Sequence, residues 1–226
     1  MNNYLAIIPA RGGSKRIPGK NLKPFLGKPV IAYVIETALQ AGVFEEVMVS
    51  TDNQEIADTA RQYGAAIPFM RSARTSDDFA ILNDVLWEVL DEYRKAGREF
   101  DAVCMLLPTA PLIRQPVLLE ALELLRHENF DSVRPVVKFP YPIQRSLRLV
   151  KNRVEMFFPE NYASRSQDLE PSYHDAGQFY WIAGNKQLTD PGKGAVVIPE
   201  MEAHDIDTQE DWDMAEIKYK LLHKLR

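Results

Sequence analysis

The chain has 226 residues, of which 46% are hydrophobic and 26% charged, and its formal net charge is −5. Length and composition fit one α/β domain with a sizeable core and exclude disordered and fibrous proteins. The acidic balance argues against nucleic acid as a partner, and the short apolar runs and missing signal peptide argue against a membrane, so we expect a cytoplasmic protein.

The first predicted element is a buried strand over residues 5–9, and a basic loop follows it. Residues 1–35 contain six Lys or Arg residues and no Asp or Glu, although the whole chain is acidic. Glycines in such a loop let backbone N–H groups approach phosphate oxygens, and open α/β sheets bind ligands at the carboxyl ends of their strands. The loop therefore predicts a site for a polyanionic ligand; the alternative is a solvated basic turn.

Two common phosphate-binding motifs are absent from this loop. Gly13 and Gly19 enclose five residues where a P-loop has four, and Asn21 stands where a P-loop has the hydroxyl that binds Mg²⁺. Gly12 and Gly13 are adjacent, so the G-x-G-x-x-G dinucleotide fingerprint is missing as well. The loop thus indicates a different kind of nucleotide site.

Strand and helix patterns then alternate along the chain. Short apolar runs predict strands over residues 47–50, 66–69, 101–107 and 132–137. Amphipathic patterns predict helices between them, from Pro29 to Gly42, around residues 56–60 with an end at Gly64, around residues 85–90 and around residues 118–125. This βαβ alternation predicts a Rossmann-like α/β fold with a mostly parallel sheet flanked by helices.

The pattern weakens from residue 138 to residue 175, where Pro, Arg and aromatic residues accumulate. A stretch of about forty residues without a crossover pattern is either functional or an interaction arm. We expect residues 1–226 to form one domain in which about 138–175 is an inserted dimerisation and substrate arm. Strands over 178–183 and 195–198 follow it, and a capping box at Thr208 begins a C-terminal helix.

Asp205 and Asp207 follow the last predicted strand. Two Asp residues at i and i+2 on an extended chain point to the same side, so both carboxylates can meet one hard cation. Mg²⁺ takes one or two protein carboxylates and completes its shell with phosphates and water. The spacing therefore favours a metal site; the alternative is that Asp207 or Thr208 only caps the last helix.

Three strings carry a resemblance to a known family. Residues 10–21, A-R-G-G-S-K-R-I-P-G-K-N, resemble the opening motif of the CMP-sugar synthetases, the cytidylyltransferases that activate sialic acid, KDO and related acidic sugars. Residues 158–170 and 173–181 look most like the pseudaminic acid cytidylyltransferases within that family. The resemblance spans the whole chain, and it implies a Rossmann-like nucleotidyltransferase fold, CTP as co-substrate, Mg²⁺ and a homodimer.

The resemblance also implies a reaction. The anomeric hydroxyl of an acidic nine-carbon sugar attacks the α-phosphorus of CTP and releases diphosphate, with no enzyme nucleophile. Catalysis is expected from Arg11, Lys20 and Asp207, and the metal is expected on Asp205 and Asp207, matching the family's D-I-D. The expected nucleotide contacts are Ala10, Arg11, Gly12, Lys20, Asn21, Arg71, Asp78 and Ala80.

The sugar contacts follow from the same resemblance. Leu107 stands where the sialic-acid enzymes carry Gln, which argues against N-acetylneuraminate as the acceptor. Arg165 is the expected carboxylate contact, in its own or the partner's site, with an intersubunit ion pair as the alternative. His174 is expected to be structural rather than catalytic. The full set is Leu107, Gln144, Tyr162, Arg165, Gln167, Tyr173, His174, Gln178 and Tyr180.

Other functions remain as alternatives at this point. Within the class, the acceptor is legionaminic or N-acetylneuraminic acid instead of pseudaminic acid. A nucleotide-dependent oxidoreductase uses a similar sheet, but the cationic first loop and the missing dinucleotide fingerprint argue against it. A catalytically silent nucleotide-binding subunit is the third alternative, and the presence of Arg11, Lys20, Asp205 and Asp207 argues against that.

Overall fold

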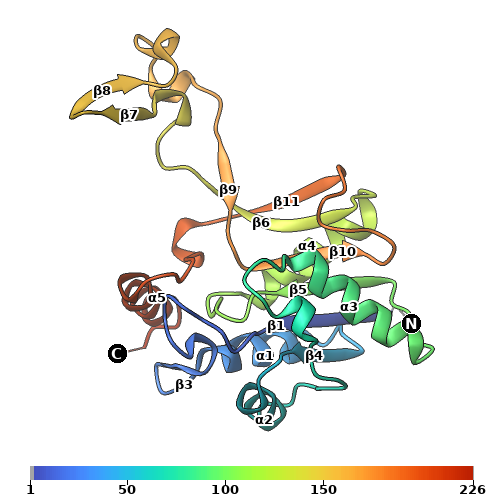
Figure 1. Cartoon of the computed structure of the whole chain (residues 1–226). Coiled ribbons are helices and arrows are strands. Elements are labelled where there is room, and N and C mark those ends of the chain that lie inside the picture. Colours follow the sequence, from blue (N-terminus) through green and yellow to red (C-terminus); the bar gives the residue numbers. More distant parts are fainter. Residues whose placement is uncertain (1–2, 226) are drawn as a thin grey trace.

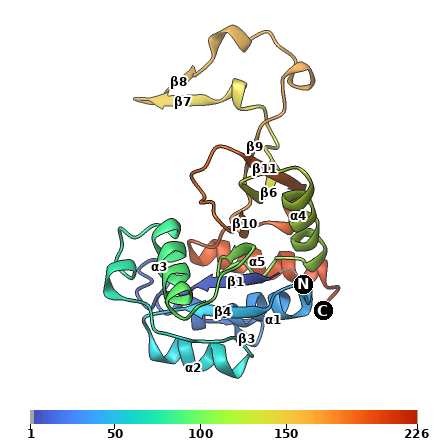
Figure 2. The ribbon, with the colours of Figure 1, turned by 90° about the vertical axis from the view of Figure 1, so that its right-hand side faces the viewer.

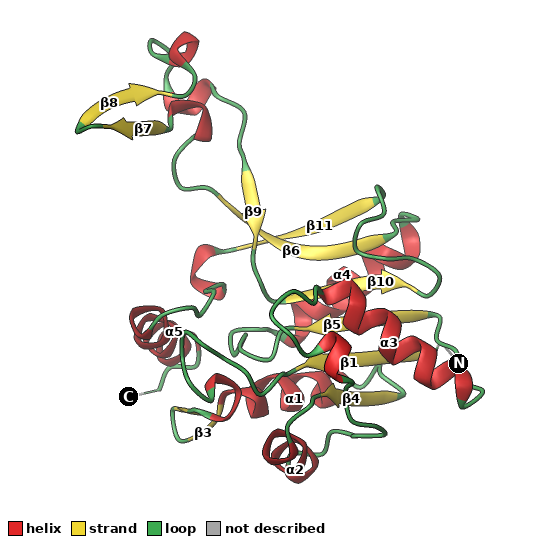
Figure 3. Cartoon of the chain, in the orientation of Figure 1, coloured by secondary structure: helices red, strands yellow, loops and turns green. Residues whose placement is uncertain are grey.

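A computed structural model describes residues 3–225 and has a seven-stranded mixed sheet at its centre (Figures 1 and 3). The strand order is β11-β6-β10-β5-β1-β4, and β9 pairs with β6 outside this path. β1 is parallel to β4 and β5, and β6 to β11, whereas β10 runs antiparallel to both of its neighbours. The strands are β1 (Tyr4–Pro9), β4 (Glu46–Ser50), β5 (Ala102–Leu106), β6 (Ser132–Lys138), β9 (Tyr173–Asp175), β10 (Phe179–Ala183) and β11 (Lys193–Ile198).

Helices cover the two faces of the sheet unequally (Figure 2). Most buried apolar residues of α1, α2 and α4 belong to one core cluster, and those of α3 to a second cluster on the opposite face. On β11, Val196 and Ile198 are buried towards the first cluster, while Val197 is 59% exposed on the other face. That face is therefore open over β6 and β11. The helices are α1 (Val30–Ala41), α2 (Gln54–Gln62), α3 (Leu82–Lys95), α4 (Gln115–His127) and α5 (Gln209–Leu222).

Local sequence signals set the ends of these helices. Pro29 precedes α1, and Gly42 ends it with φ 67°, a left-handed conformation that suits glycine. The predicted capping box is confirmed at α5, where the Thr208 hydroxyl accepts from the Asp211 amide at 3.2 Å and the Asp211 carboxylate accepts from the Thr208 amide at 2.7 Å. None of the helices within residues 3–225 combines the length and apolar character needed to cross a bilayer.

One predicted strand is wrong. The segment over 66–69 makes only a single bridge, in which the Ala66 amide donates to the Val47 carbonyl and the Val49 amide donates to the Ala66 carbonyl. Pro68 has no N–H to continue the ladder, so the chain leaves the sheet edge. The antiparallel β10 is also a departure from a simple βαβ series, although the core of the sheet is parallel as predicted.

A third core cluster joins the two ends of the chain. It combines Ile17 and Phe25 from the first loop region with Ile206 and Trp212 from the C-terminal segment. Phe25 belongs to the short hairpin β2 (Pro24–Phe25) and β3 (Lys28–Pro29), and its ring meets Trp212 edge-on at 5.6 Å. This packing holds the basic loop against the segment that carries Asp205 and Asp207.

Residues 138–175 leave the sheet at the end of β6 and return to it at β9, and the part between these strands projects away from the α/β body, as Figure 1 shows. Their hairpin consists of β7 (Leu147–Val150) and β8 (Arg153–Met156). Three short 3-10 turns accompany it: η3 (Ile143–Arg145), η4 (Pro159–Asn161) and η5 (Ser166–Asp168). We call this segment the arm. Its exposed large apolar side chains are Phe139, Tyr141, Ile143, Leu147, Leu149, Val150, Val154, Phe157, Phe158, Tyr162 and Tyr173.

Candidate active site

The loop after β1 turns back into the protein at Gly19. Gly19 has φ 61°, which favours glycine, and it precedes the short helix η1 (Lys20–Leu22). The turn directs Lys20 inward, where only 16% of its side chain is exposed. Asn21 is buried and donates from Nδ2 to the Arg11 carbonyl oxygen at 2.9 Å, which ties the two ends of the loop together.

The loop borders a cavity of about 400 Å³ that is strongly cationic. Among the described residues that line it, four are Lys or Arg and none is an acid. A concave surface with one sign of charge concentrates a ligand of the opposite sign, so this cavity suits phosphate groups. We call it the phosphate cavity; it is lined by Pro9, Arg11, Ser14, Lys15, Arg16, Lys20, Asn21, Pro108 and Thr109.

A second cavity, of about 530 Å³, adjoins the first, because Pro9 and Arg11 line both. Arg71 lines it and is buried; its Nε donates to Ser50 Oγ at 3.0 Å and its Nη2 to the Ser50 carbonyl. Burial lowers the pKa of Arg71 to about 10, which leaves it charged at neutral pH. We call this the base cavity; its other lining residues are Thr75, Asp77, Ala80, Ile81, Leu82, Asn83, Val85, Leu188 and Thr189.

Glu88 on α3 holds one wall of the base cavity, the turn η2 (Ala73–Thr75). Its buried carboxylate accepts from the Ser72 amide at 2.7 Å, from the Ser72 hydroxyl at 2.8 Å and from the Thr75 hydroxyl. Burial by itself raises the pKa of Glu88, but these hydrogen bonds and the Arg71 charge together lower it below its ordinary 4.5. Glu88 is therefore an ionised anchor of the turn.

The segment before α5 presents Asp205 and Asp207 on one side of an extended chain. Ile206 between them is fully buried in the third core cluster, so its two neighbours turn outward. Lys20 Nζ donates to the Ile206 carbonyl at 2.6 Å and lies 3.8 Å from Asp207 Oδ1. The basic loop and the Asp pair therefore form one site, although Lys20 and Ile206 are 186 positions apart.

The Asp pair fits a hard divalent cation. Asp205 is exposed at the surface, yet partial burial raises its pKa, and the neighbouring Asp207 carboxylate raises it further. Two carboxylates that repel each other gain from a cation placed between them. Residues 3–225 hold no cluster of three or more His, Cys, Asp or Glu side chains suited to a metal, so a cation on this pair would need further ligands from water or a bound molecule.

Three residues predicted to contact the nucleotide line neither cavity. Ala10 is fully buried, and the Gly12 amide donates to Asp52 Oδ1 at 2.9 Å. Asp78 pairs with two cations of the loop, and their hydrogen bonds, first that of Lys15, lower its pKa. The predicted nucleotide contacts that do line the cavities are Arg11, Lys20, Asn21, Arg71 and Ala80.

Two of the predicted sugar contacts lie near the Asp pair. Tyr180 is half-buried on β10, and its pKa is raised by burial first, by Asp175 next, and by Asp205 to a smaller extent. His174 and Asp205 line one cavity of about 300 Å³. His174 Nδ1 is 2.9 Å from the Asp175 carbonyl oxygen, a contact that orients its ring.

Two others, Leu107 and Gln178, lie at the sheet itself. The Leu107 amide donates to the Gln178 carbonyl at 2.8 Å, so the two segments are paired just beyond the end of β5. The Gln178 side chain is buried and donates from Nε2 to the Glu202 carbonyl. The amide of Gln178 is thus engaged inside the protein.

The remaining predicted sugar contacts lie on the arm. Gln144 donates from Nε2 to the Glu170 carbonyl at 3.0 Å, and Arg165, 75% exposed, pairs with Asp168 at 2.9 Å. Figure 1 shows the hairpin β7–β8 and the turns beside it far from the carboxyl end of β1, whereas Tyr173 begins β9 and pairs with Lys138 of β6. Within one chain, therefore, Lys20 is not brought together with Gln144, Tyr162, Arg165 or Gln167.

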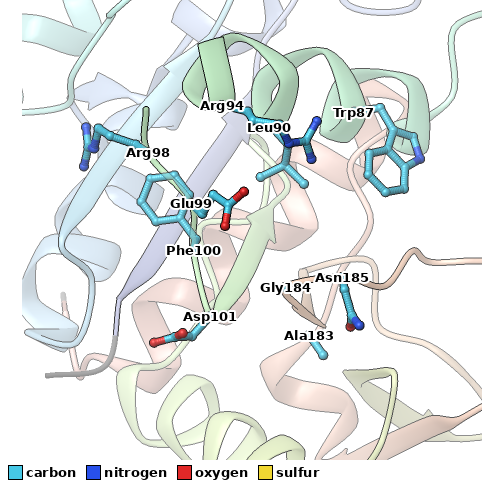
Figure 4. Close-up of a pocket in the computed structure, with 10 residues that line it drawn as sticks. All are labelled: Trp87, Leu90, Arg94, Arg98, Glu99, Phe100, Asp101, Ala183, Gly184 and Asn185. Atoms are coloured by element: carbon cyan, nitrogen blue, oxygen red, sulfur yellow. The ribbon is translucent and has the colours of Figure 1, made fainter. Parts of the chain in front are cut away.

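A further cavity, of about 550 Å³, lies at the opposite end of β5, where Asp101 precedes the strand (Figure 4). Trp87 and Arg94 reach it from α3, and Gly184 lines it just after β10. Its acids balance its cations, and Arg98 is already paired with Glu45 and Glu46. This charge balance and its position away from the strand carboxyl ends distinguish it from the phosphate cavity.

Sequence reasoning did not single out every residue of the site. Ser14, Lys15 and Arg16 line the phosphate cavity, and the high cation count of the loop was the available signal for them. Asn83 and Thr189 line the base cavity and carry no pattern of their own in the sequence. Only the packing of the β10–β11 connection against α3 brings Thr189 there, with Asn83 Nδ2 at 3.5 Å from its hydroxyl.

A cationic cavity beside a second cavity, with a carboxylate pair next to Lys20, suits a ligand that carries phosphate groups. The model of the family described as Cytidylyltransferase matches residues 5–188, and the protein belongs to that family. The family resemblance drawn from the sequence is therefore confirmed.

Individual relatives align with nearly the whole chain and support this family assignment. The protein is 42% identical to pseudaminic acid cytidylyltransferase of Campylobacter jejuni, with 97% of each chain covered. It is 35% identical to CMP-N,N'-diacetyllegionaminic acid synthase of Legionella pneumophila, with 94% of each covered. A solved CMP:2-keto-3-deoxy-manno-octonic acid synthetase in complex with CTP matches with a TM-score of 0.71 at 20% identity, covering 99% of this chain and 100% of that one, which confirms the predicted fold class.

Proposed function

We propose that the protein transfers CMP from CTP to the anomeric hydroxyl of pseudaminic acid and releases diphosphate. The observation that carries this proposal is the pair of adjoining cavities that share Arg11, one cationic and one suited to a base. The 42% identity to the Campylobacter jejuni enzyme over 97% of both chains supports the choice of sugar.

Lys20 and Arg11 are the proposed electrostatic catalysts. Negative charge builds on the phosphates as diphosphate leaves, and preorganised cations in a cavity stabilise that charge. Lys20 is held in place by the Ile206 carbonyl, and Arg11 Nη1 by the Asp77 carbonyl at 2.8 Å. Both side chains are thus positioned before the substrate arrives. Asn21 also fixes the backbone at Arg11, because its Nδ2 donates to the Arg11 carbonyl oxygen.

Asp205 and Asp207 are the proposed holders of Mg²⁺. When bound, the cation polarises the phosphate oxygens and offsets developing charge. Asp207 also lies next to Lys20 and Arg16. When no CTP is bound, these two cations therefore still have a carboxylate as a partner. The segment from Asp205 to Asp207 therefore serves the metal and the cations of the loop.

Selection of the base is assigned to the base cavity. The 4-amino group of cytosine needs an acceptor, and the backbone carbonyl near Ala80 is the proposed one. With UTP, that acceptor faces the 4-oxo group and stays unpaired, at a cost of roughly 1–3 kcal/mol, which corresponds to roughly 5- to 150-fold in selectivity. Arg71 is held in the wall of this cavity by its hydrogen bonds to Ser50.

The arm is the proposed dimer contact. Its cluster of exposed aromatic and aliphatic side chains is larger than the scattered apolar residues normal on a monomer. A second copy that packs on the arm brings Tyr162, Arg165 or Gln167 to the partner's site, which a single chain does not do.

The test is a panel of acidic sugars with CTP and Mg²⁺, read by mass spectrometry of the CMP product and by diphosphate release. Pseudaminic acid is expected to give the highest kcat/KM, with legionaminic and N-acetylneuraminic acids at least about tenfold lower. Replacement of CTP by UTP is expected to lower the rate by roughly 5- to 150-fold. A better rate with legionaminic acid favours the second candidate, in line with the 35% identity to the Legionella pneumophila synthase.

A further inference from the structure

Arg134 lies in the middle of β6, on the part of the sheet face that α3 leaves open. Its neighbours Val133 and Val137 are buried towards α4, so the alternation of the strand turns Arg134 to the open face. There the guanidinium lies over the ring of Tyr180 on β10, at 4.9 Å from the ring centroid. About a fifth of the side chain is exposed.

The guanidinium of Arg134 is only partly satisfied. Its Nη1 donates to Asp175 Oδ2 at 3.2 Å. Its Nε and Nη2 atoms are buried and have no hydrogen-bond partner among residues 3–225. The N–H groups of these two atoms run along one edge of the guanidinium, the edge that pairs with both oxygens of a carboxylate. Buried donors without partners are unfavourable, and a carboxylate on this edge relieves that cost.

A chain of contacts connects Arg134 to the Asp pair. Asp175, held by Arg134, also accepts from the Gly177 amide at 2.8 Å. Gly177 lies against Asp205, since a Cβ at this position meets the Asp205 side chain at 3.8 Å. The charges of Asp175 and, to a smaller extent, Asp205 raise the pKa of Tyr180, so its hydroxyl lies near both carboxylates. Arg134 therefore lies near the Asp pair that is proposed to hold the metal. The acceptor sugar has to bind in this same region.

We propose that Arg134 recognises the carboxylate of the acidic sugar through its Nε and Nη2 atoms. This inference rests on the proposed function and adds a specificity-determining residue from the chain's own sheet. Because the two atoms are buried, the side chains that cover them, Tyr180 among them, shift when the sugar binds. The other candidate for this role is Arg165, which is paired with Asp168 on the distant arm.

The test compares the free acid of the sugar with its methyl ester, which removes the carboxylate charge. Wild-type protein is expected to prefer the acid by about tenfold or more in kcat/KM, since a charge-assisted bidentate pair is lost with the ester. Arg134→Met is expected to bring this ratio close to one, with the KM for CTP within about twofold of wild type. Arg134→Lys keeps the charge without the bidentate edge and is expected to retain only part of the ratio.

A merely structural role for Arg134 lowers turnover of acid and ester equally and leaves the ratio unchanged, which overturns the proposal. If circular dichroism shows that Arg134→Met does not fold, the acid-to-ester ratio of Arg134→Lys tests the proposal instead. A ratio in Arg134→Lys equal to that of the wild type then overturns it. Arg165→Ala tests the other candidate; loss of the ratio there, with its retention in Arg134→Met, assigns the carboxylate to the arm instead and overturns the proposal. Wild-type protein that makes the CMP-sugar without distinguishing acid from ester overturns the Arg134 assignment alone. Protein that makes no CMP-sugar overturns the proposed function and this assignment with it.

Discussion

Lys20 is a cation that the fold has taken largely out of water. Burial lowers its pKa, and the charges of Asp207 and then Asp205 oppose that effect. Among residues 3–225, its one close hydrogen-bond partner is the Ile206 carbonyl, and Asp207 Oδ1 stays 3.8 Å away. A desolvated cation with an incomplete set of partners interacts more strongly with an incoming phosphate than a solvated one does.

Lys20→Ala is expected to lower kcat by roughly 10² to 10³, the usual effect of removing one preorganised donor to developing charge. The melting temperature should change little, because the substitution removes both the bond to Ile206 and the cost of burying the charge. Diphosphate release and thermal unfolding measure the two effects. Lys28→Ala, a cation paired with Glu36 outside the cavity, is the control and should keep its rate. A large stability loss with a normal rate contradicts the phosphate role.

Asp205→Asn is expected to raise the Mg²⁺ concentration for half-maximal rate by at least about tenfold, because an amide is a weaker ligand for a hard cation than a carboxylate. Binding of Mn²⁺, followed by its electron paramagnetic resonance signal, gives a readout independent of turnover. Asp213→Asn on α5 is the matched control, since the Asp213 carboxylate accepts from Gln209 Nε2 of the same helix at 2.7 Å. Unchanged metal affinity in Asp205→Asn contradicts the assignment of this pair.

At the scale of elements, the base cavity depends on one contact between a helix and a turn. α3 presents Glu88 to the backbone and hydroxyls of the turn that ends at Thr75, and the same turn meets Arg71 Nη1 at 3.5 Å. The helix supports the cavity wall without lining it at this residue. A change in Glu88 therefore acts on nucleotide affinity through the position of the turn.

Glu88→Gln is expected to destabilise the protein by about 1–3 kcal/mol at pH 7, because a side-chain amide cannot accept all three hydrogen bonds. The folded-state pKa of Glu88 lies below its ordinary 4.5, so its stabilisation is complete above pH 4.5 and is lost as the pH falls through the lowered value. The difference in melting temperature between the two proteins should therefore shrink below pH 4.5.

The KM for CTP should rise more than kcat falls in Glu88→Gln, since the turn lines the nucleotide cavity and not the phosphate cavity. Glu92→Gln, one turn further along α3 and paired with Lys95, serves as the control. Equal pH profiles for wild type and Glu88→Gln contradict the role of Glu88 as an ionised anchor.

At the scale of the whole protein, the α/β body and the arm differ in how much of their apolar surface is exposed. The α/β body buries its apolar residues in three clusters, whereas the arm leaves many of its own exposed. On the hairpin, Leu149 faces Val154 across the two strands, and they are 70% and 62% exposed. A two-stranded hairpin is only marginally stable alone in water, so a packing partner is expected for it.

We predict a homodimer that the double substitution Leu149→Glu with Val154→Glu converts to a monomer, as measured by light scattering coupled to gel filtration. The body should stay folded, because neither side chain belongs to a core cluster. Arg148→Glu with Glu155→Arg swaps an exposed ion pair on the same hairpin and should keep the dimer if the apolar pair provides the contact. A wild-type monomer with full activity contradicts the dimer and any contribution of the arm across it.

The sequence by itself determined the fold class, the family and the first half of the site. Apolar periodicity, Pro and Gly at helix ends and the cation-rich loop are local features, because they depend on neighbours a few residues apart. The capping box at Thr208 and the outward pair around Ile206 were predictable for the same reason.

Contacts between distant segments were decided only by the tertiary structure. The third core cluster sets Lys20 against the Ile206 carbonyl, and the antiparallel β10 sets Tyr180 beneath Arg134. The predicted strand over 66–69 failed because Pro68 ends pairing at the sheet edge. The arm residues were predicted as sugar contacts in their own or a partner's site, and a single chain does not bring the outer part of the arm to its own site. Strand order and direction follow from how apolar faces pack across the whole sheet, and that packing is a sum over residues far apart in the chain.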